Sequence, residues 1–66
     1  MTLNQLRYFC TASRCHSITK AAEELYVTQP TVSVAIRDLA IEFGISLFYR
    51  KGNRLILTEE GEELYN

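Results

Sequence analysis

Apolar residues recur at helical spacing in the middle of the chain, over residues 28–43. Four of them fall at i, i+4, i+7 and i+11, along one stripe of a helix: Val32, Ile36, Leu39 and Phe43. Thr28 is a good N-cap, and Pro30 falls in the first turn, where a missing N–H costs little. Gly44 follows the last apolar residue, where a left-handed C-cap is common. The pattern predicts a helix over residues 28–43 with one buried face.

The opposite face of this predicted helix is short, polar and lightly charged. It carries Gln29, Thr31, Ser33, Val34 and Arg37. Such a face suits a helix laid against base edges in the major groove of DNA. The same residues also fit the ordinary surface of an amphipathic helix, and this helix alone does not decide between the two interpretations.

The chain before residue 28 predicts two shorter helices. Thr2 and Gln5 have the spacing of a capping box, so the first helix is expected to begin at about Leu3. Its apolar stripe consists of Leu3, Leu6, Phe9 and Cys10, while Arg7, Thr11 and Arg14 face elsewhere. Residues 14–16 are expected to form a short connection.

The second helix is predicted over residues 18–26, starting from Ser17 or Thr19. Its buried face consists of Ile18, Ala21, Ala22 and Leu25, and the alanines allow another helix to cross closely. Val27 and Thr28 then form a tight turn into the helix at residues 28–43. Two helices joined by such a turn are a helix-turn-helix, in which the second helix reads the DNA.

The pattern changes after Gly44. Two short apolar-rich segments, residues 47–50 and 54–57, are separated by Lys51, Gly52 and Asn53, which predicts a β-hairpin with a basic tip. Thr58 is expected to cap a fourth helix, whose first turn carries two glutamates. The predicted fold is mainly α: a winged helix-turn-helix with a three-helix core, a two-stranded β wing and the start of a linker helix.

Composition and charge narrow the class of protein. The chain has 66 residues, of which 47% are hydrophobic, which predicts one small folded domain. No apolar run is long enough to span a membrane and no signal peptide is seen, so we expect a cytoplasmic protein without membrane contact. The net charge is −1, but residues 1–58 hold all seven cations and four acids, a net +3, and the last eight residues hold four glutamates. A locally basic surface with an acidic tail remains compatible with phosphate binding.

Cys10, Cys15 and His16 are the candidates for metal or nucleophile chemistry. They lack a Cys-x-x-Cys pair and a fourth ligand, and adjacent residues rarely orient as nucleophile and base. We expect Cys10 to pack in the core, together with Tyr8, Phe9, Phe43 and Phe48. We therefore predict that the chain binds no metal and no cofactor and is not an enzyme. A metal-sensing domain is the rival hypothesis, which zinc-dependent stability would support.

Several spaced motifs resemble the N-terminal domain of LysR-type transcriptional regulators. They are Ser-Ile-Thr-Lys-Ala-Ala-Glu-Glu-Leu at 17–25, Val-Thr-Gln-Pro-Thr-Val-Ser at 27–33, Leu-Phe-x-Arg at 47–50, Arg54, and Leu-Thr-x-x-Gly at 57–61. The resemblance covers essentially the whole chain. It implies a winged helix-turn-helix in residues 1–58, and in residues 59–66 the beginning of a linker helix that pairs two subunits as a homodimer. It also implies an effector-binding domain of two α/β lobes, which is absent from these 66 residues.

Two positions depart from the family pattern. The family commonly has Gln where this chain has Ala35, and Glu where it has Ala40. Both changes remove a polar group on or beside the predicted reading helix. We therefore do not extend the usual operator preference of the family to this chain, whereas DNA binding itself is still expected.

The predicted partner is double-stranded DNA. Base contacts are expected from Gln29, Pro30, Thr31, Ser33 and Val34. Phosphate or minor-groove contacts are expected from Ser17, Thr19, Lys20, Thr28, Arg37, Arg50, Lys51 and Arg54. The blander interpretation gives Ser17 only a capping role and makes Arg50, Lys51 and Arg54 a solvated cluster. The alternative function is a winged helix that binds a protein partner, which the modest net charge favours.

Overall fold

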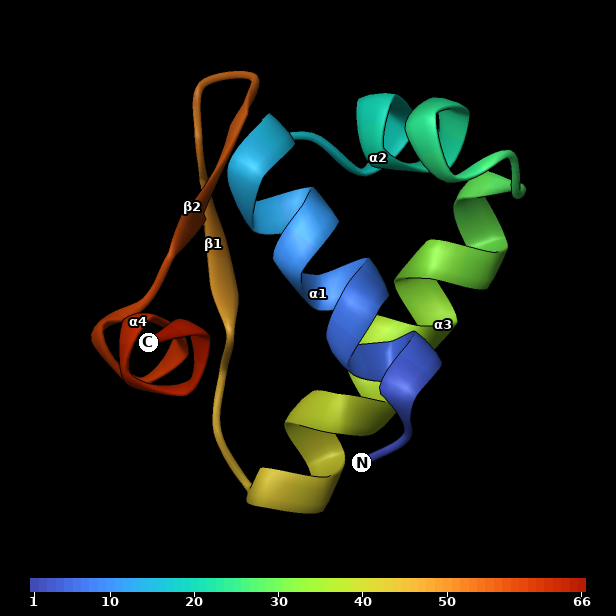
Figure 1. The fold of residues 1–66 in the computed structure, drawn as a ribbon. Helices are drawn as coiled ribbons and strands as arrows, with labels where there is room; N and C mark the ends of the chain where they lie inside the picture. Colours follow the sequence, from blue (N-terminus) through green and yellow to red (C-terminus); the bar gives the residue numbers. More distant parts are fainter.

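The computed structural model describes residues 1–66 as four helices and one antiparallel sheet (Figure 1). The elements in chain order are α1 Leu3–Cys15, α2 Ile18–Leu25, α3 Gln29–Phe43, β1 Phe48–Lys51, β2 Arg54–Leu57 and α4 Glu59–Tyr65. This order confirms the predicted three helices, hairpin and fourth helix. None of the helices combines the length and apolar character needed to cross a membrane.

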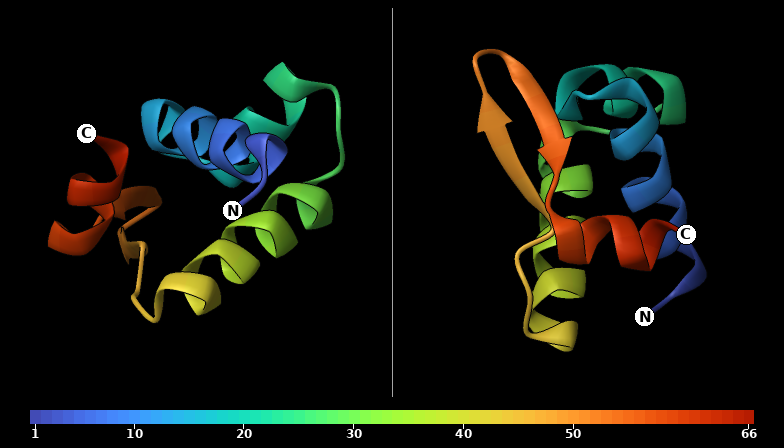
Figure 2. Two further views of the ribbon diagram at one scale, coloured as in Figure 1. Left: turned by 60° about the horizontal axis from the view of Figure 1, so that its bottom comes forward. Right: turned by 90° about the vertical axis from the view of Figure 1, so that its left-hand side faces the viewer.

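Helices α1, α2 and α3 enclose the core, and the hairpin and α4 lie beside α1 (Figure 2). Phe9 of α1, Ala21 of α2, and Val32 and Leu39 of α3 are fully buried. Ala22 is also buried, so both alanines predicted on the buried face of α2 lie in the core. Leu47 and Leu55 extend the same core under the hairpin.

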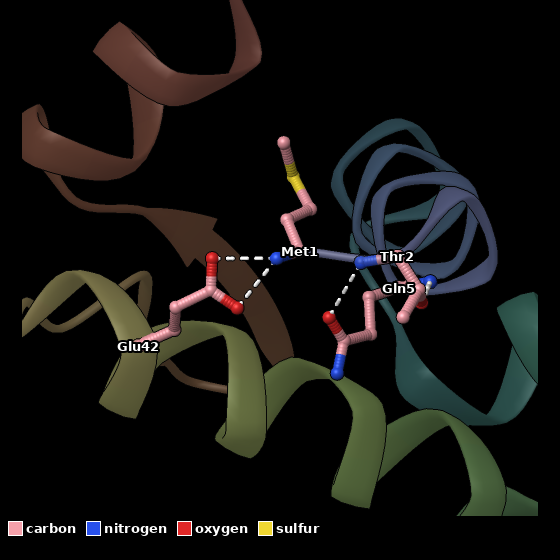
Figure 3. A network of polar contacts seen from close by, with 4 residues as sticks. All are labelled: Met1, Thr2, Gln5 and Glu42. Carbon is pink, nitrogen blue, oxygen red and sulfur yellow. Dashed lines mark hydrogen bonds and ion pairs between the residues drawn. The ribbon is translucent and has the colours of Figure 1, made fainter.

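The start of α1 is held by polar contacts, one set within its first turn and one to α3 (Figure 3). Thr2 and Gln5 form the predicted capping box: the Gln5 N–H donates to Thr2 Oγ1 at 3.0 Å, and the Thr2 N–H donates to Gln5 Oε1 at 2.9 Å. The terminal ammonium of Met1 donates to both carboxylate oxygens of Glu42, at 2.5 and 2.6 Å. These contacts join the beginning of α1 to the second half of α3.

The ends of α1 and α2 differ from the prediction. Helix α1 continues through Cys15, so residues 14 and 15 are helical and His16 alone makes the left-handed C-cap, at φ 55°. Helix α2 ends at Leu25, and Tyr26 is its left-handed C-cap, at φ 59°. The N–H of Val27 donates to the carbonyl of Ala22 at 3.0 Å, a hydrogen bond typical of a Schellman motif. Neither cap is a glycine, the residue that usually marks a left-handed helix end, so the sequence did not indicate where these helices end.

The apolar stripes predicted for α1 and α3 include terminal residues that are exposed in the structure. Leu3 is 81% exposed and Phe43 is 44% exposed, whereas both were expected in the core. The reason for Phe43 is that the last turn of α3 projects beyond α1 (Figure 1) and has no neighbouring helix to cover it. Conversely, Thr11, expected to face elsewhere, is buried with Ser13; their hydroxyls donate to the carbonyls of Arg7 and Phe9 at 2.8 Å.

The hairpin is tighter than predicted. Strand β1 starts at Phe48 and includes Lys51, which pairs with Arg54, so the turn consists of Gly52 and Asn53 only. Gly52 has φ 63°, a conformation that glycine adopts without steric cost. Leu47 lies before the strand and is buried. Its carbonyl accepts the N–H of Thr58 at 3.0 Å, which closes the base of the wing.

Helix α4 begins as predicted and packs closely against the base of the wing. Thr58 is its N-cap and accepts the N–H of Gly61 at 2.9 Å. A Cβ at Gly61 would lie 2.3 Å from the carbonyl oxygen of Leu47. Only glycine therefore permits this close approach.

Candidate nucleic-acid interface

Helix α3 separates a buried face from an exposed face. Val32, Ile36 and Leu39 are buried in the core. The five predicted base-contacting residues are all exposed on the first two turns: Gln29, Pro30, Thr31, Ser33 and Val34. The structure thus places an exposed, largely uncharged surface at the start of the helix, held by an apolar stripe on the opposite side.

The cap of α3 orders two hydroxyls beside this surface. Thr28 Oγ1 accepts the N–H of Thr31 at 3.4 Å and lies 2.8 Å from Thr31 Oγ1. When Thr31 donates in the second contact, Thr28 accepts two hydrogen bonds and its own hydroxyl hydrogen remains available. Thr28 can therefore cap the helix and also donate to an anionic oxygen.

A shallow cleft of about 550 Å³ lies between this face of α3 and the first turns of α1. Pro30, Thr31, Val34 and Ala35 line one side, and Asn4, Gln5 and Tyr8 line the other. The α1 side chains were not predicted at the site. Periodicity marks the face of one helix, but it does not say which residues of a distant helix lie next to it. Ala35, one of the two departures from the family pattern, lies inside this cleft.

The start of α2 and the tip of the wing meet around a second hollow, of about 360 Å³. It is lined by Ser17 and Lys20 from α2, by Asn53 and Arg54 from the hairpin, and by Cys15 and His16. Ser17 Oγ accepts the N–H of Lys20 at 3.1 Å, so its predicted capping role is confirmed. Thr19 is exposed on the same first turn. Two groups of predicted phosphate-contacting residues, separate in the sequence, thus share one hollow.

The wing carries three exposed cations, Arg50, Lys51 and Arg54, and none of them forms an ion pair within the chain. Lys51 and Arg54 are direct cross-strand partners. Two like charges in such positions repel each other, and an anion at the tip would relieve the repulsion. In Figure 1 and in the right view of Figure 2, the hairpin tip and α2 lie at the same end of the molecule.

The other arginines have different surroundings. Arg37 is exposed, and its guanidinium lies 3.7 Å from the Asp38 carboxylate, a contact of little energy in water. Arg14 pairs with Glu24; the hydrogen bond to that carboxylate, and then its charge, raise the pKa of Arg14. Lys20, by contrast, has no ion pair.

Cys10, Cys15 and His16 do not converge on one point. Cys10 packs against the core, as expected. The ring of His16 contacts the backbone of Leu55 through Nδ1, at 3.0 Å. No group of three His, Cys, Asp or Glu side chains has the geometry to hold a metal ion.

Comparison with known proteins gives one consistent family. A family model described as bacterial regulatory helix-turn-helix protein, lysR family, matches residues 3–62. The RuBisCO operon transcriptional regulator of Allochromatium vinosum is 47% identical over 66 residues, covering 100% of this chain and 22% of that protein. The glycine cleavage system transcriptional activator of Escherichia coli K12 is 49% identical over 63 residues, covering 96% of this chain and 21% of that protein. The chain thus spans about a fifth of the length of these curated relatives.

Two similar solved structures are complexes with DNA. The BenM DNA-binding domain with benA site 1 DNA matches at a TM-score of 0.92 and 40% identity, covering 98% of this chain and 73% of that chain. The CbnR DNA-binding domain–DNA complex matches at a TM-score of 0.93 and 28% identity, covering 98% of this chain and 75% of that chain.

Proposed function

The chain belongs to the lysR family of bacterial regulatory helix-turn-helix proteins, and on this premise we propose that it binds double-stranded DNA sequence-specifically to regulate transcription. The observation that carries the proposal is the division of α3 into two faces. Its first two turns are exposed and largely uncharged, while its apolar stripe is anchored in the core. The DNA complexes formed by the related BenM and CbnR domains support the same function.

In this proposal the start of α3 enters the major groove and reads base edges. Gln29 has an amide that pairs with both N6 and N7 of adenine, and Ser33 bonds to either donors or acceptors. Thr31 and Val34 offer methyl groups to the methyl group of thymine. Pro30 contacts the groove by packing, in addition to starting the helix. Ala35 lies in the cleft beside these residues and offers no polar group to a base.

Phosphate contacts supply most of the affinity in this proposal. At the start of α2 they come from Ser17, Thr19 and Lys20, where the positive end of the helix dipole also favours an anion. Along α3 they come from Thr28 and Arg37. At the wing they come from Arg50, Lys51 and Arg54, which clamp the backbone or the minor groove.

The proposed division of the chain is a DNA-binding unit in residues 1–58 and the start of a linker helix in residues 59–66. In the whole protein this helix continues and pairs two subunits, so that two domains engage two half-sites. Leu57 and Leu64 are partly buried against the core, and Tyr65 is 42% exposed at the end of α4. A single domain then binds weakly, because it lacks the effective concentration that a second half-site provides. A regulator that acts on bacterial DNA works in the cytoplasm.

The proposal is tested by the salt dependence of binding to random-sequence duplex DNA. Four predicted phosphate-contacting cations have no ion pair within the chain: Lys20, Arg50, Lys51 and Arg54. Four such contacts give a slope of log K against log salt of roughly −3 to −4. Fluorescence anisotropy at several salt concentrations measures this slope. Absence of binding at low salt would overturn the proposal and favour a protein partner.

A further inference from the structure

His16 is joined to the wing by two hydrogen bonds that no sequence pattern predicts. The N–H of Leu55 donates to the His16 carbonyl at 3.0 Å, and His16 Nδ1 lies 3.0 Å from the Leu55 carbonyl oxygen. A carbonyl oxygen only accepts, so Nδ1 carries a hydrogen and donates it. The ring and the backbone of His16 thus satisfy both the N–H and the C=O of a residue 39 positions away.

These contacts occupy the free edge of β2. Leu55 faces Arg50 across the hairpin, and its backbone polar groups bond to His16 on the side away from β1. Adjacent residues of an antiparallel strand alternate in the direction of their backbone groups, which agrees with this arrangement. His16 therefore ties the wing to the turn between α1 and α2.

The immediate chain neighbours of the tied pair belong to the proposed interface. Ser17 follows His16, and Arg54 precedes Leu55. These neighbours, with Lys20 and Asn53, line the hollow of about 360 Å³ that His16 also lines. A two-stranded hairpin is only marginally stable by itself, and like charges face each other at this tip, so its position depends on what holds it to the helices.

Resting on the DNA-binding function proposed above, we propose that His16 is a positioning residue for the wing. Its ring holds β2 so that Arg54 stays opposite the start of α2, and one stretch of DNA backbone then contacts both. The Leu55 side chain, 6% exposed, anchors the strand in the core, and the His16 ring fixes the backbone from which Arg54 projects.

The informative variant is His16→Gly. Glycine fits the left-handed conformation at φ 55° and keeps the carbonyl that accepts from Leu55, so the change removes the ring and leaves the backbone hydrogen bond. Tyr26→Gly is the matched control, because Tyr26 is the other left-handed residue that is not a glycine, at φ 59°, and its 95% exposed side chain makes no hydrogen bond. His16→Asn keeps a side-chain donor and tolerates the same backbone conformation.

The measurement is a double-mutant cycle on binding to random duplex DNA, with Arg54→Ala as the second change. We expect His16→Gly to weaken binding roughly 3- to 10-fold, the size of one lost hydrogen bond. We expect Arg54→Ala to flatten the salt slope by about one unit in the parent chain and by less than half of that in the His16→Gly background. In the Tyr26→Gly background, Arg54→Ala should flatten the salt slope as much as in the parent chain. In the His16→Asn background, part of the flattening that is lost in His16→Gly should return.

If Arg54→Ala weakens binding and flattens the salt slope as much in the His16→Gly background as in the parent chain, the role of His16 is overturned and the proposed function stands. No binding by the parent chain would overturn both. Circular dichroism melting checks that each variant is folded. If His16→Gly does not fold, the same cycle with His16→Ala, which also removes the ring and its donor, decides, and full additivity there overturns the inference.

Discussion

Ile36 and Val34 lie two residues apart on opposite faces of α3, so we predict that their truncation has very different effects on the free energy of unfolding. Ile36 is 9% exposed and belongs to the core cluster, whereas Val34 is 43% exposed on the other side. Truncating a buried Ile to Ala destabilises a protein by about 2–5 kcal/mol through lost burial and the cavity that remains. At about 0.05–0.15 kcal/mol per residue, a chain of 66 residues has a free energy of unfolding of about 3–10 kcal/mol. Ile36→Ala therefore removes a large part of the free energy of unfolding of the chain.

Thermal and urea unfolding, followed by circular dichroism, measure the difference. We expect Ile36→Ala to lower the melting temperature by at least about 8 °C and the urea midpoint in proportion. Val34→Ala, the matched control on the same helix, should change the free energy of unfolding by no more than about 0.5 kcal/mol. An unchanged melting temperature for Ile36→Ala, or a larger loss for Val34→Ala, would show that the face assignments of α3 are reversed.

Three further variants test single contacts. Gly61→Ala should destabilise the chain by about 1–3 kcal/mol, because its Cβ would lie 2.3 Å from the Leu47 carbonyl oxygen; a higher urea midpoint would instead mean that helix propensity outweighs the close approach. Tyr26→Gly should raise the free energy of unfolding by about 0.5–1 kcal/mol, because it relieves a left-handed residue, and a lower melting temperature would contradict this. Arg54→Ala should weaken binding to every duplex and flatten the salt slope by about one unit, while Arg7→Ala, outside the proposed interface, should leave the slope unchanged.

Local signals predicted most of the architecture. The capping box at Thr2, the N-caps Ser17 and Thr28, and the glycine after α3 each depend on residues a few positions apart, and the structure has all of them. The buried stripe of α3 was also predictable through Leu39, since period and face are properties of a single helix.

Burial and hydrogen bonding could not be predicted from the sequence where they depend on an element far along the chain. Phe43 continues the apolar period, but no other helix reaches the end of α3 to cover it (Figure 1). Nothing near His16 in the sequence indicates that its ring bonds to Leu55, because the partners are 39 residues apart. The α1 side chains of the cleft beside α3 were missed for the same reason, since helix packing brings them there.

The claim that α3 reads bases is tested most directly by Gln29→Ala. A duplex selected from a random library by the chain, joined to a dimerising partner, is compared with a scrambled duplex. We expect the variant to lose about 1–3 kcal/mol of binding free energy, roughly 5- to 150-fold in affinity, on the selected duplex and almost nothing on the scrambled one. Equal losses on both duplexes, or no loss on either, would contradict the claim.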